Sequence, residues 1–143
     1  MKSISRRHCC HALLAIAGLL VTMFPTTESA SQVVSGAEEM PVVKLTIDYD
    51  DGVTKQFTKL EWKEGLTVLG ALQQAAKHPR GIKPAIQGSG EFTLVIAIDE
   101  LKNEGNGKNW MYKVNGKFAD RSCGIHKLAA GDEVTWVFTD MKP

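Results

Sequence analysis

Cys123 and His126 are the residues of this sequence whose types and spacing come closest to a reactive site. A thiolate and an imidazole three residues apart could be two ligands of a zinc ion, or the nucleophile and base of a small thiol enzyme. Zinc needs further ligands, and His78, another histidine of the predicted mature chain, lies at the end of a predicted helix. We therefore expect no metal site and no catalytic residues, and we keep the thiol enzyme as the last of three alternatives.

Three large aromatic residues, Trp110, Tyr112 and Trp136, form the second candidate site. They could make a stacking platform for a flat ligand or a sugar ring, because rigid rings provide contact area at little cost in entropy. Their alternating placement along the chain instead favours a role in the core between sheet and helix. If a ligand site exists, we expect Asn109, Trp110 and Tyr112 to bind the ligand, with the loop 103–108 as its rim.

The size and charge of the chain limit the classes of protein to which it can belong. It has 143 residues, with 17 Lys and Arg against 16 Asp and Glu, and a formal net charge of +1. A chain of this length has room for one domain and little more. The balanced charge excludes a strongly basic nucleic-acid-binding protein. We therefore expect a small molecule or another protein as the partner, and no nucleic acid.

The first 30 residues have the pattern of a signal peptide. Basic residues precede an apolar run, His11–Phe24, which is short for a membrane span, and small residues follow for cleavage after Ser29 or Ala30. The alternative is a retained N-terminal anchor. We expect cleavage, no membrane span in the mature chain, and export to a periplasm or out of the cell. A polar leader, residues 31–40, would then precede a single domain at 41–140.

The domain begins with a predicted hairpin and a helix. Alternating apolar residues predict strands from Val43 to Tyr49 and from Val53 to Leu60, joined by turn residues at 50–52. Thr67 is a typical N-cap for a helix whose apolar residues recur at three- and four-residue spacing. The helix should end at His78, because the following proline disfavours helical geometry in the residue before it. Residues 79–90 are expected to be a connecting loop.

Four more strands are expected after the loop. Phe92–Ile98 is apolar on both faces, which is typical of a central strand. A hairpin should turn at Asn115-Gly116, between residues 110–114 and 117–119, and the last strand should span Glu133–Thr139. One helix cannot cover both faces of a sheet. The predicted fold class is therefore α+β, a β-grasp-like mixed sheet with one helix packed across it.

Three stretches of the sequence together resemble a known family, the transcobalamin C-terminal-like domain, also called DUF4430. They are Gly65–Leu72 (GLTVLGAL), Asn109–Lys117 (NWMYKVNGK) and Leu128–Trp136 (LAAGDEVTW). The resemblance covers nearly all of residues 42–139. In the vitamin B12 carriers this domain is the smaller lobe, which closes over a corrinoid held against a larger helical domain. The resemblance implies the fold of this family and a binding role.

We therefore expect an exported, non-enzymatic, single-domain binding or interaction module. The first alternative is a corrinoid-binding accessory protein that works with a separate helical partner, because this chain has no helical-repeat domain of its own. We expect no cofactor, and a corrinoid is the ligand only in that alternative. The other alternative is the thiol enzyme that would use Cys123 and His126.

Overall fold

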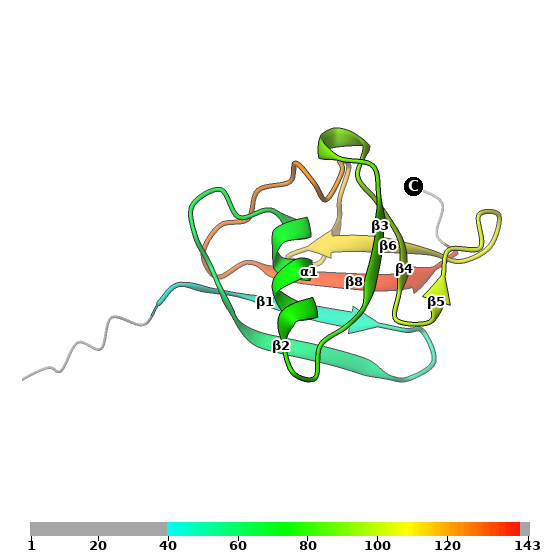
Figure 1. Cartoon of the computed structure of the whole chain (residues 1–143), viewed down its shortest axis with the longest axis horizontal. Helices are drawn as coiled ribbons and strands as arrows, with labels where there is room; N and C mark the ends of the chain where they lie inside the picture. Colours follow the sequence, from blue (N-terminus) through cyan, green and yellow to red (C-terminus); the bar gives the residue numbers. More distant parts are fainter. Residues whose placement is uncertain (1–39, 141–143) are drawn as a thin grey trace, which may run out of the picture. The chain divides into compact units, whose positions relative to one another are not determined.

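The computed structural model describes residues 40–140. The predicted signal peptide at 1–30 and nearly all of the predicted leader lie outside the described residues. Within the described part the chain forms one α-helix, one short 3-10 helix and eight strands (Figure 1). In chain order they are β1 (Val42–Asp48), β2 (Thr54–Glu61), α1 (Val68–Lys77), β3 (Pro84–Gln87), η1 (Gly90–Phe92), β4 (Leu94–Ile98), β5 (Leu101–Lys102), β6 (Asn109–Val114), β7 (Lys117–Phe118) and β8 (Glu133–Thr139).

The larger sheet has five strands in the order β2-β1-β8-β6-β7. The first and last long strands of the domain, β1 and β8, lie side by side and are parallel, whereas the other pairs are antiparallel. Ile47 pairs with Trp136 in this register, and Trp136 pairs with Tyr112 on its other side. The alternating residues of three strands therefore form one continuous apolar face, as the period of two predicts.

A second sheet of three strands, β3-β4-β5, was not expected. The prediction of a plain loop at 79–90 is wrong, because Pro84–Gln87 pairs antiparallel with β4. The segment is short and begins with a proline, which is tolerated at the first position of an edge strand although it weakens the sequence signal. The expectation of one mixed sheet therefore holds for the larger sheet alone.

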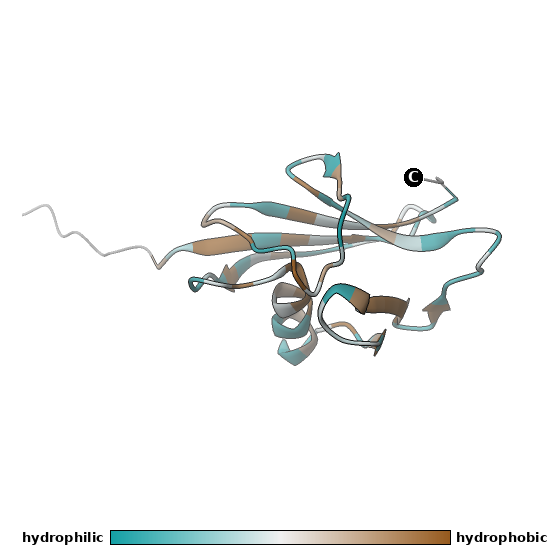
Figure 2. Cartoon of the chain, turned by 90° about the horizontal axis from the view of Figure 1, so that it is seen from above, coloured by the Kyte–Doolittle hydropathy of each residue, from teal (hydrophilic) through white to brown (hydrophobic). Residues whose placement is uncertain are grey.

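The helix and the smaller sheet lie on the same side of the larger sheet. Figure 2 shows the helix below the long strands, with the short strands beside it. Helix α1 contacts β1, β2 and β3, and β4 contacts β6. The fold is thus mixed α and β with one α-helix, and a single layer made of α1 and the smaller sheet covers the apolar face of the larger sheet. The core lies between these two layers.

Local signals in the sequence predicted the helix and the turns correctly. The Thr67 hydroxyl accepts a hydrogen bond from the Gly70 N–H at 3.1 Å, which is the predicted N-cap. The helix ends at Lys77, with His78 as its C-cap. Asn115 and Gly116 have φ values of +51° and +81°, as a two-residue hairpin between β6 and β7 requires.

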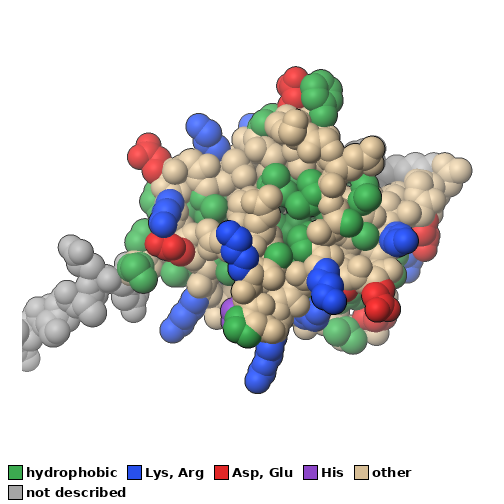
Figure 3. All heavy atoms as spheres, in the orientation of Figure 1, with side chains coloured by type: hydrophobic (Ala, Val, Ile, Leu, Met, Phe, Trp, Pro, Cys, Tyr) green, Lys and Arg blue, Asp and Glu red, His purple; other side chains and the backbone are tan. Residues whose placement is uncertain are grey.

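The aromatic residues of β6 and β8 are part of the core. Trp110, Tyr112 and Trp136 are 3%, 8% and 2% exposed, which confirms the prediction from their alternating placement. The strand β4 is the middle strand of its sheet, but its outer face is open. Leu94 and Ile96 lie exposed there, and Phe92 precedes them in η1. Figure 3 shows hydrophobic side chains gathered over the region of β3 and β4.

No helix among residues 40–140 is long and apolar enough to cross a membrane. The single α-helix has ten residues and buries only one of its faces, formed by Val68, Ala71, Leu72 and Ala75.

The side chain of Asn103 connects the two sheets where no strand ladder does. Its amide donates to the Val95 carbonyl at 3.0 Å, and its oxygen accepts from the Trp110 N–H at 2.8 Å. Both of these residues are buried. The Asn103 amide therefore satisfies two backbone groups that would otherwise lose their partners inside the protein.

Asn103→Ala should lower the free energy of unfolding by about 2–3 kcal/mol, because it leaves both backbone groups without a partner. The measurement is urea unfolding followed by tryptophan fluorescence. Lys102→Ala is the control, since the exposed neighbouring side chain should change stability by no more than about 0.5 kcal/mol. Equal stability of the two variants would contradict the connecting role of Asn103.

Candidate functional site

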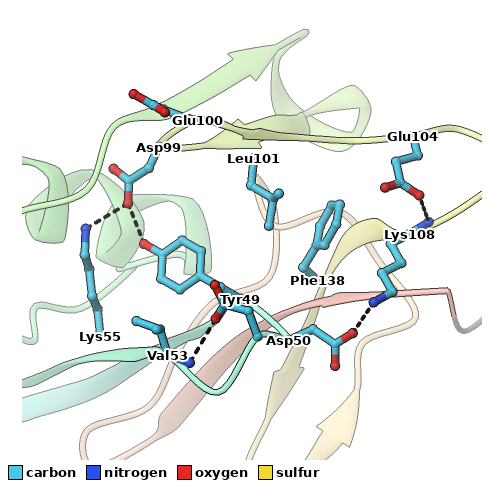
Figure 4. A pocket seen from close by; sticks show the side chains of 11 residues that line it. Tyr49, Asp50, Val53, Lys55, Asp99, Glu100, Leu101, Glu104, Lys108 and Phe138 are labelled. Atoms are coloured by element: carbon cyan, nitrogen blue, oxygen red, sulfur yellow. Dashed lines mark hydrogen bonds and ion pairs between the residues drawn. The ribbon is translucent and has the colours of Figure 1, made fainter.

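A groove lies at the end of the domain where three turns meet. It has a volume of about 720 Å³ and lies between the β1–β2 turn, the β4–β5 turn and the loop before β6 (Figure 4). The residues that line it are Tyr49, Asp50, Asp51, Val53, Lys55, Asp99, Glu100, Leu101, Glu104, Lys108 and Phe138. Segments that lie far apart in the sequence therefore make one site.

The floor of the groove is apolar. Leu101 and Phe138 point toward one another in the middle of the groove (Figure 4). Behind them the Trp110 ring lies 5.3 Å from Phe138 and 5.7 Å from Tyr49, measured between ring centroids. The Trp110 indole N–H donates to the Leu101 carbonyl at 2.9 Å. This hydrogen bond fixes the short strand β5 against the larger sheet and holds the floor in place.

One side of the groove depends on the carboxylate of Asp99. It accepts hydrogen bonds from the Tyr49 hydroxyl at 2.5 Å, the Lys55 ammonium at 2.8 Å and the Lys83 backbone N–H at 2.9 Å. Asp99 lies in the β4–β5 turn with φ +54°, a conformation that aspartate tolerates better than most residues. The carboxylate thus joins the β4–β5 turn to the residue after β1, to β2 and to the chain before β3.

The protonation of this cluster follows from its hydrogen bonds. Burial acts to raise the pKa of Asp99, but the hydrogen bonds from Lys55, Tyr49 and Lys83 outweigh burial and hold the pKa below its ordinary value. Burial, followed by the hydrogen bond to Asp99, raises the pKa of Tyr49 well above its usual range. At neutral pH Asp99 is therefore a carboxylate and Tyr49 a neutral phenol.

The opposite side of the groove is held by a second ion pair. The Lys108 ammonium lies 2.5 Å from the Asp50 carboxylate, and the Lys108 backbone N–H donates to the Glu104 carboxylate at 2.8 Å. The Asn109 side chain donates to the carbonyls of Gly105 and Gly107 and accepts from the Gly105 N–H, each at 3.0 Å. The loop before β6 thus has a defined conformation at the rim.

The rim of the groove is predominantly acidic. Five carboxylates line it, against two lysines, and each of the lysines is already paired with one carboxylate. The Glu100 side chain is exposed, and its carboxylate forms no hydrogen bond or ion pair with another described residue. The groove can therefore accept a ligand with an apolar body and positively charged or N–H-bearing groups.

The three predicted ligand-binding residues are neighbours, but they do not line this groove. The Asn109 side chain makes hydrogen bonds within the loop at the rim. Trp110 and Tyr112 line a smaller cavity, which lies on the opposite side of the Trp110 ring from the groove. No residue of β6 lines the groove, and the lining residue nearest to this strand is Lys108, which precedes it. The prediction missed Tyr49 and Asp99, because no local pattern connects two residues that lie 50 positions apart in the chain. The only sequence signal was the run of acidic residues at 48–51.

The structure places Cys123 in the interior and His126 beside Tyr112. Cys123 is 3% exposed, and burial raises the pKa of its thiol to about 11, so the unreactive protonated form predominates at neutral pH. His126 lies with Nδ1 3.1 Å from the Tyr112 hydroxyl. Among residues 40–140, no three His, Cys, Asp or Glu side chains are grouped so that they could hold a metal ion.

Comparison with known protein families shows to which family this chain belongs. A family model described as a domain of unknown function (DUF4430) matches residues 65–140, which is more than half of the chain. The chain belongs to the DUF4430 family. The match begins just before α1 and runs to the end of β8, so it includes the acidic turn of the groove at Asp99 as well as the strand β6.

The fold of this DUF4430 chain is also found in a solved structure. It is a crystal structure from Ruminococcus gnavus ATCC 29149, described as a "putative metal binding protein", with 13% sequence identity and a TM-score of 0.51. The alignment covers 71% of this chain and 99% of that chain. At this identity the similarity concerns the fold alone. No curated protein matches the chain.

Asp99→Asn should reduce the free energy of unfolding at pH 7 by about 1–2 kcal/mol, because the amide keeps the turn conformation but loses the charge that Lys55 and Tyr49 stabilise. The pKa of Asp99 is lower in the folded protein than in the unfolded chain. Its stabilising effect is therefore complete above pH about 4 and is lost as the pH falls through the folded pKa.

The difference in stability between wild type and Asp99→Asn should accordingly shrink below pH about 4, as measured by urea unfolding at pH 7, 4 and 3. Glu100→Gln is the matched control. It removes a charge from the adjacent residue, which makes none of these hydrogen bonds, and should have little effect on stability. A constant difference between wild type and Asp99→Asn from pH 7 to pH 3 would show that the carboxylate charge is not what holds the turn.

Proposed function

We propose that this chain is an exported binding module that acts by holding a ligand in the groove and does not catalyse a reaction. The observation that carries the proposal is the groove itself, which combines an apolar floor with an acidic rim. Its walls are fixed by hydrogen bonds and ion pairs before any ligand arrives. Such preformed concave sites with a few placed polar groups are typical of binding sites for small molecules.

The chemistry of the lining defines the class of ligand. Leu101, Phe138 and Val53 offer apolar contact, and the carboxylates of Asp51 and Glu100 stand at the rim without a lysine partner. A ligand with an apolar ring and a cationic or N–H-donating group satisfies both parts of this lining. An anionic ligand would meet like charges, which disfavours binding.

The export proposal rests on the sequence alone, through the basic start and apolar run of residues 1–30. The proposal of a non-enzymatic role is supported by the burial of Cys123, because its raised pKa removes the nucleophile that the thiol-enzyme alternative requires.

A corrinoid remains the specific ligand that the family resemblance suggests. Corrinoids carry amide side chains around a flat ring, so their N–H groups could meet the rim carboxylates. Titration with dicyanocobinamide tests this alternative, since binding would shift its visible absorption bands and raise the melting temperature of the protein. The absence of both effects at high ligand concentration would exclude a corrinoid as the ligand. It would not refute the groove as a binding site, which the next experiment tests.

Protonated tryptamine and indole-3-acetate form a matched pair of probes, with the same ring but opposite charges. We expect tryptamine to bind with a dissociation constant of about 1 mM and indole-3-acetate to bind at least about tenfold more weakly. Two-dimensional NMR titration measures both affinities. It should locate the shifted amide signals at Asp51, Glu100 and Leu101.

The double variant Asp51→Asn/Glu100→Gln should weaken tryptamine binding about three- to tenfold, because each exposed charge contributes modestly. Glu91→Gln/Glu133→Gln is the matched control, since it makes the same change in net charge at exposed residues that do not line the groove. Equal weakening by both double variants, or equal binding of both probes, would refute the groove as a site for cationic ligands.

A further inference from the structure

A second cavity lies in the domain and shares no lining residue with the groove. It has a volume of about 170 Å³ and lies between β4, β6, β8 and the segment after β7. The residues that line it are Thr93, Leu94, Val95, Trp110, Met111, Tyr112, Ala119, Arg121, Ser122, Cys123 and Trp136. Its walls are therefore mostly aromatic and aliphatic side chains.

The indole N–H of Trp136 has no acceptor among the described residues, although the side chain is only 2% exposed. The other two tryptophans behave differently. The Trp62 N–H donates to the Leu128 carbonyl at 2.7 Å, and the Trp110 N–H donates to the Leu101 carbonyl at 2.9 Å. A buried donor without a partner is unfavourable and uncommon, so the one at Trp136 needs an explanation.

The second unpaired group is at the same cavity. The Thr93 hydroxyl is the only other buried side-chain polar atom without a partner in the described part of the chain, and Thr93 is 7% exposed. Its oxygen lies close to Gly124, where an added Cβ would come within 2.4 Å of it. Ser122 closes the wall beside it by donating to the carbonyls of Gly90 and Thr93 at 3.1 and 3.0 Å.

The cavity carries no free charge. Arg121 is the one charged residue that lines it, and its guanidinium is bonded to the Asp120 carboxylate at 2.9 Å. The Tyr112 hydroxyl donates to the Arg121 carbonyl at 2.7 Å. The Cys123 thiol and the Tyr112 phenol are neutral at physiological pH, because burial raises the pKa of both groups. An ionised ligand would have no compensating charge in this cavity.

We propose that this cavity is a binding site for a small uncharged molecule with a compact apolar body and a carbonyl or hydroxyl oxygen that accepts the Trp136 N–H. The Thr93 hydroxyl at the edge of the cavity is a second hydrogen-bonding group for such a molecule. A cavity of about 150 Å³ is known to accommodate benzene, so the volume suits a molecule of six to nine non-hydrogen atoms. The groove plays no part in this proposal.

Acetophenone and α-methylstyrene are suitable probes, because they share one shape and differ in a carbonyl oxygen that is replaced by a CH₂ group. In ¹⁵N NMR spectra of the full chain, acetophenone should move the Trp136 indole N–H signal downfield, as a new hydrogen bond requires. It should leave the Trp62 signal in place, since that N–H already has a partner. α-Methylstyrene should bind about five- to tenfold more weakly and cause no downfield shift of Trp136.

Trp136→Phe removes the donor and keeps an aromatic ring. It should weaken acetophenone binding about five- to tenfold and leave α-methylstyrene binding within about twofold. Trp62→Phe is the matched control and should change neither affinity. Without ligand, Trp136→Phe should also lower the melting temperature less than Trp110→Phe, because only the latter leaves a carbonyl without its donor.

The titrations of the wild-type protein decide the question even if Trp136→Phe does not fold. The Trp136 indole N–H signal could show a nuclear Overhauser effect to water and fail to move when acetophenone is added. This result would mean that water alone fills the cavity, and it would overturn the proposal. Equal affinity for the two probes would overturn it as well, since the oxygen would then not be recognised. Slower iodoacetamide labelling of Cys123 at pH 9 in the presence of acetophenone would support it, because this thiol lines the cavity.

Discussion

The two sheets of this domain meet without sharing a strand, and this constraint governs the rest of the structure. Where two sheets are joined by a ladder, the backbone groups satisfy one another. Here the side chain of Asn103 takes that role between β4 and β6, and the carboxylate of Asp99 connects the β4–β5 turn to Tyr49 and Lys55 of the β1–β2 hairpin in the larger sheet. Two short polar side chains therefore hold the covering layer in register, and both stand beside a potential binding site.

The aromatic residues between the layers divide the interior into two sites. Trp110 lies between the groove and the cavity, with Phe138 and Tyr49 on one side of it and the cavity on the other. Its N–H is bonded to a carbonyl of β5, so its ring is fixed. Trp136 is as deeply buried, but its N–H has no acceptor within residues 40–140. Both tryptophans line the cavity, so the hydrogen bond of the indole N–H is what distinguishes them.

Membership of the DUF4430 family establishes a relationship and leaves the activity open, because one fold can carry many functions. An argument about function must therefore rest on the sites. The groove is wide, open and acidic, whereas the cavity is smaller and lined mostly by apolar side chains, and its one charged residue, Arg121, is paired with Asp120. Sites that differ so much in size and charge select different ligands. The Cys123 thiol lines the cavity and is buried, and burial raises its pKa.

Several features of this protein follow from the sequence alone, because they depend on residues close together in the chain. The N-cap at Thr67, the end of the helix at His78 and the hairpin at Asn115-Gly116 are of this kind. The burial of Trp110, Tyr112 and Trp136 also follows, because strand geometry gives a period of two.

Other features depend on which distant segments meet, and only the tertiary structure decides them. The strand at Pro84–Gln87 exists because β4 provides its hydrogen-bonding partner, and its four residues carry too weak a propensity to reveal it. Tyr49 and Asp99 form one side of the groove although 50 positions separate them. The missing partner of the Trp136 N–H is likewise a property of the folded interior, because hydrogen-bond satisfaction depends on every segment that packs around the donor.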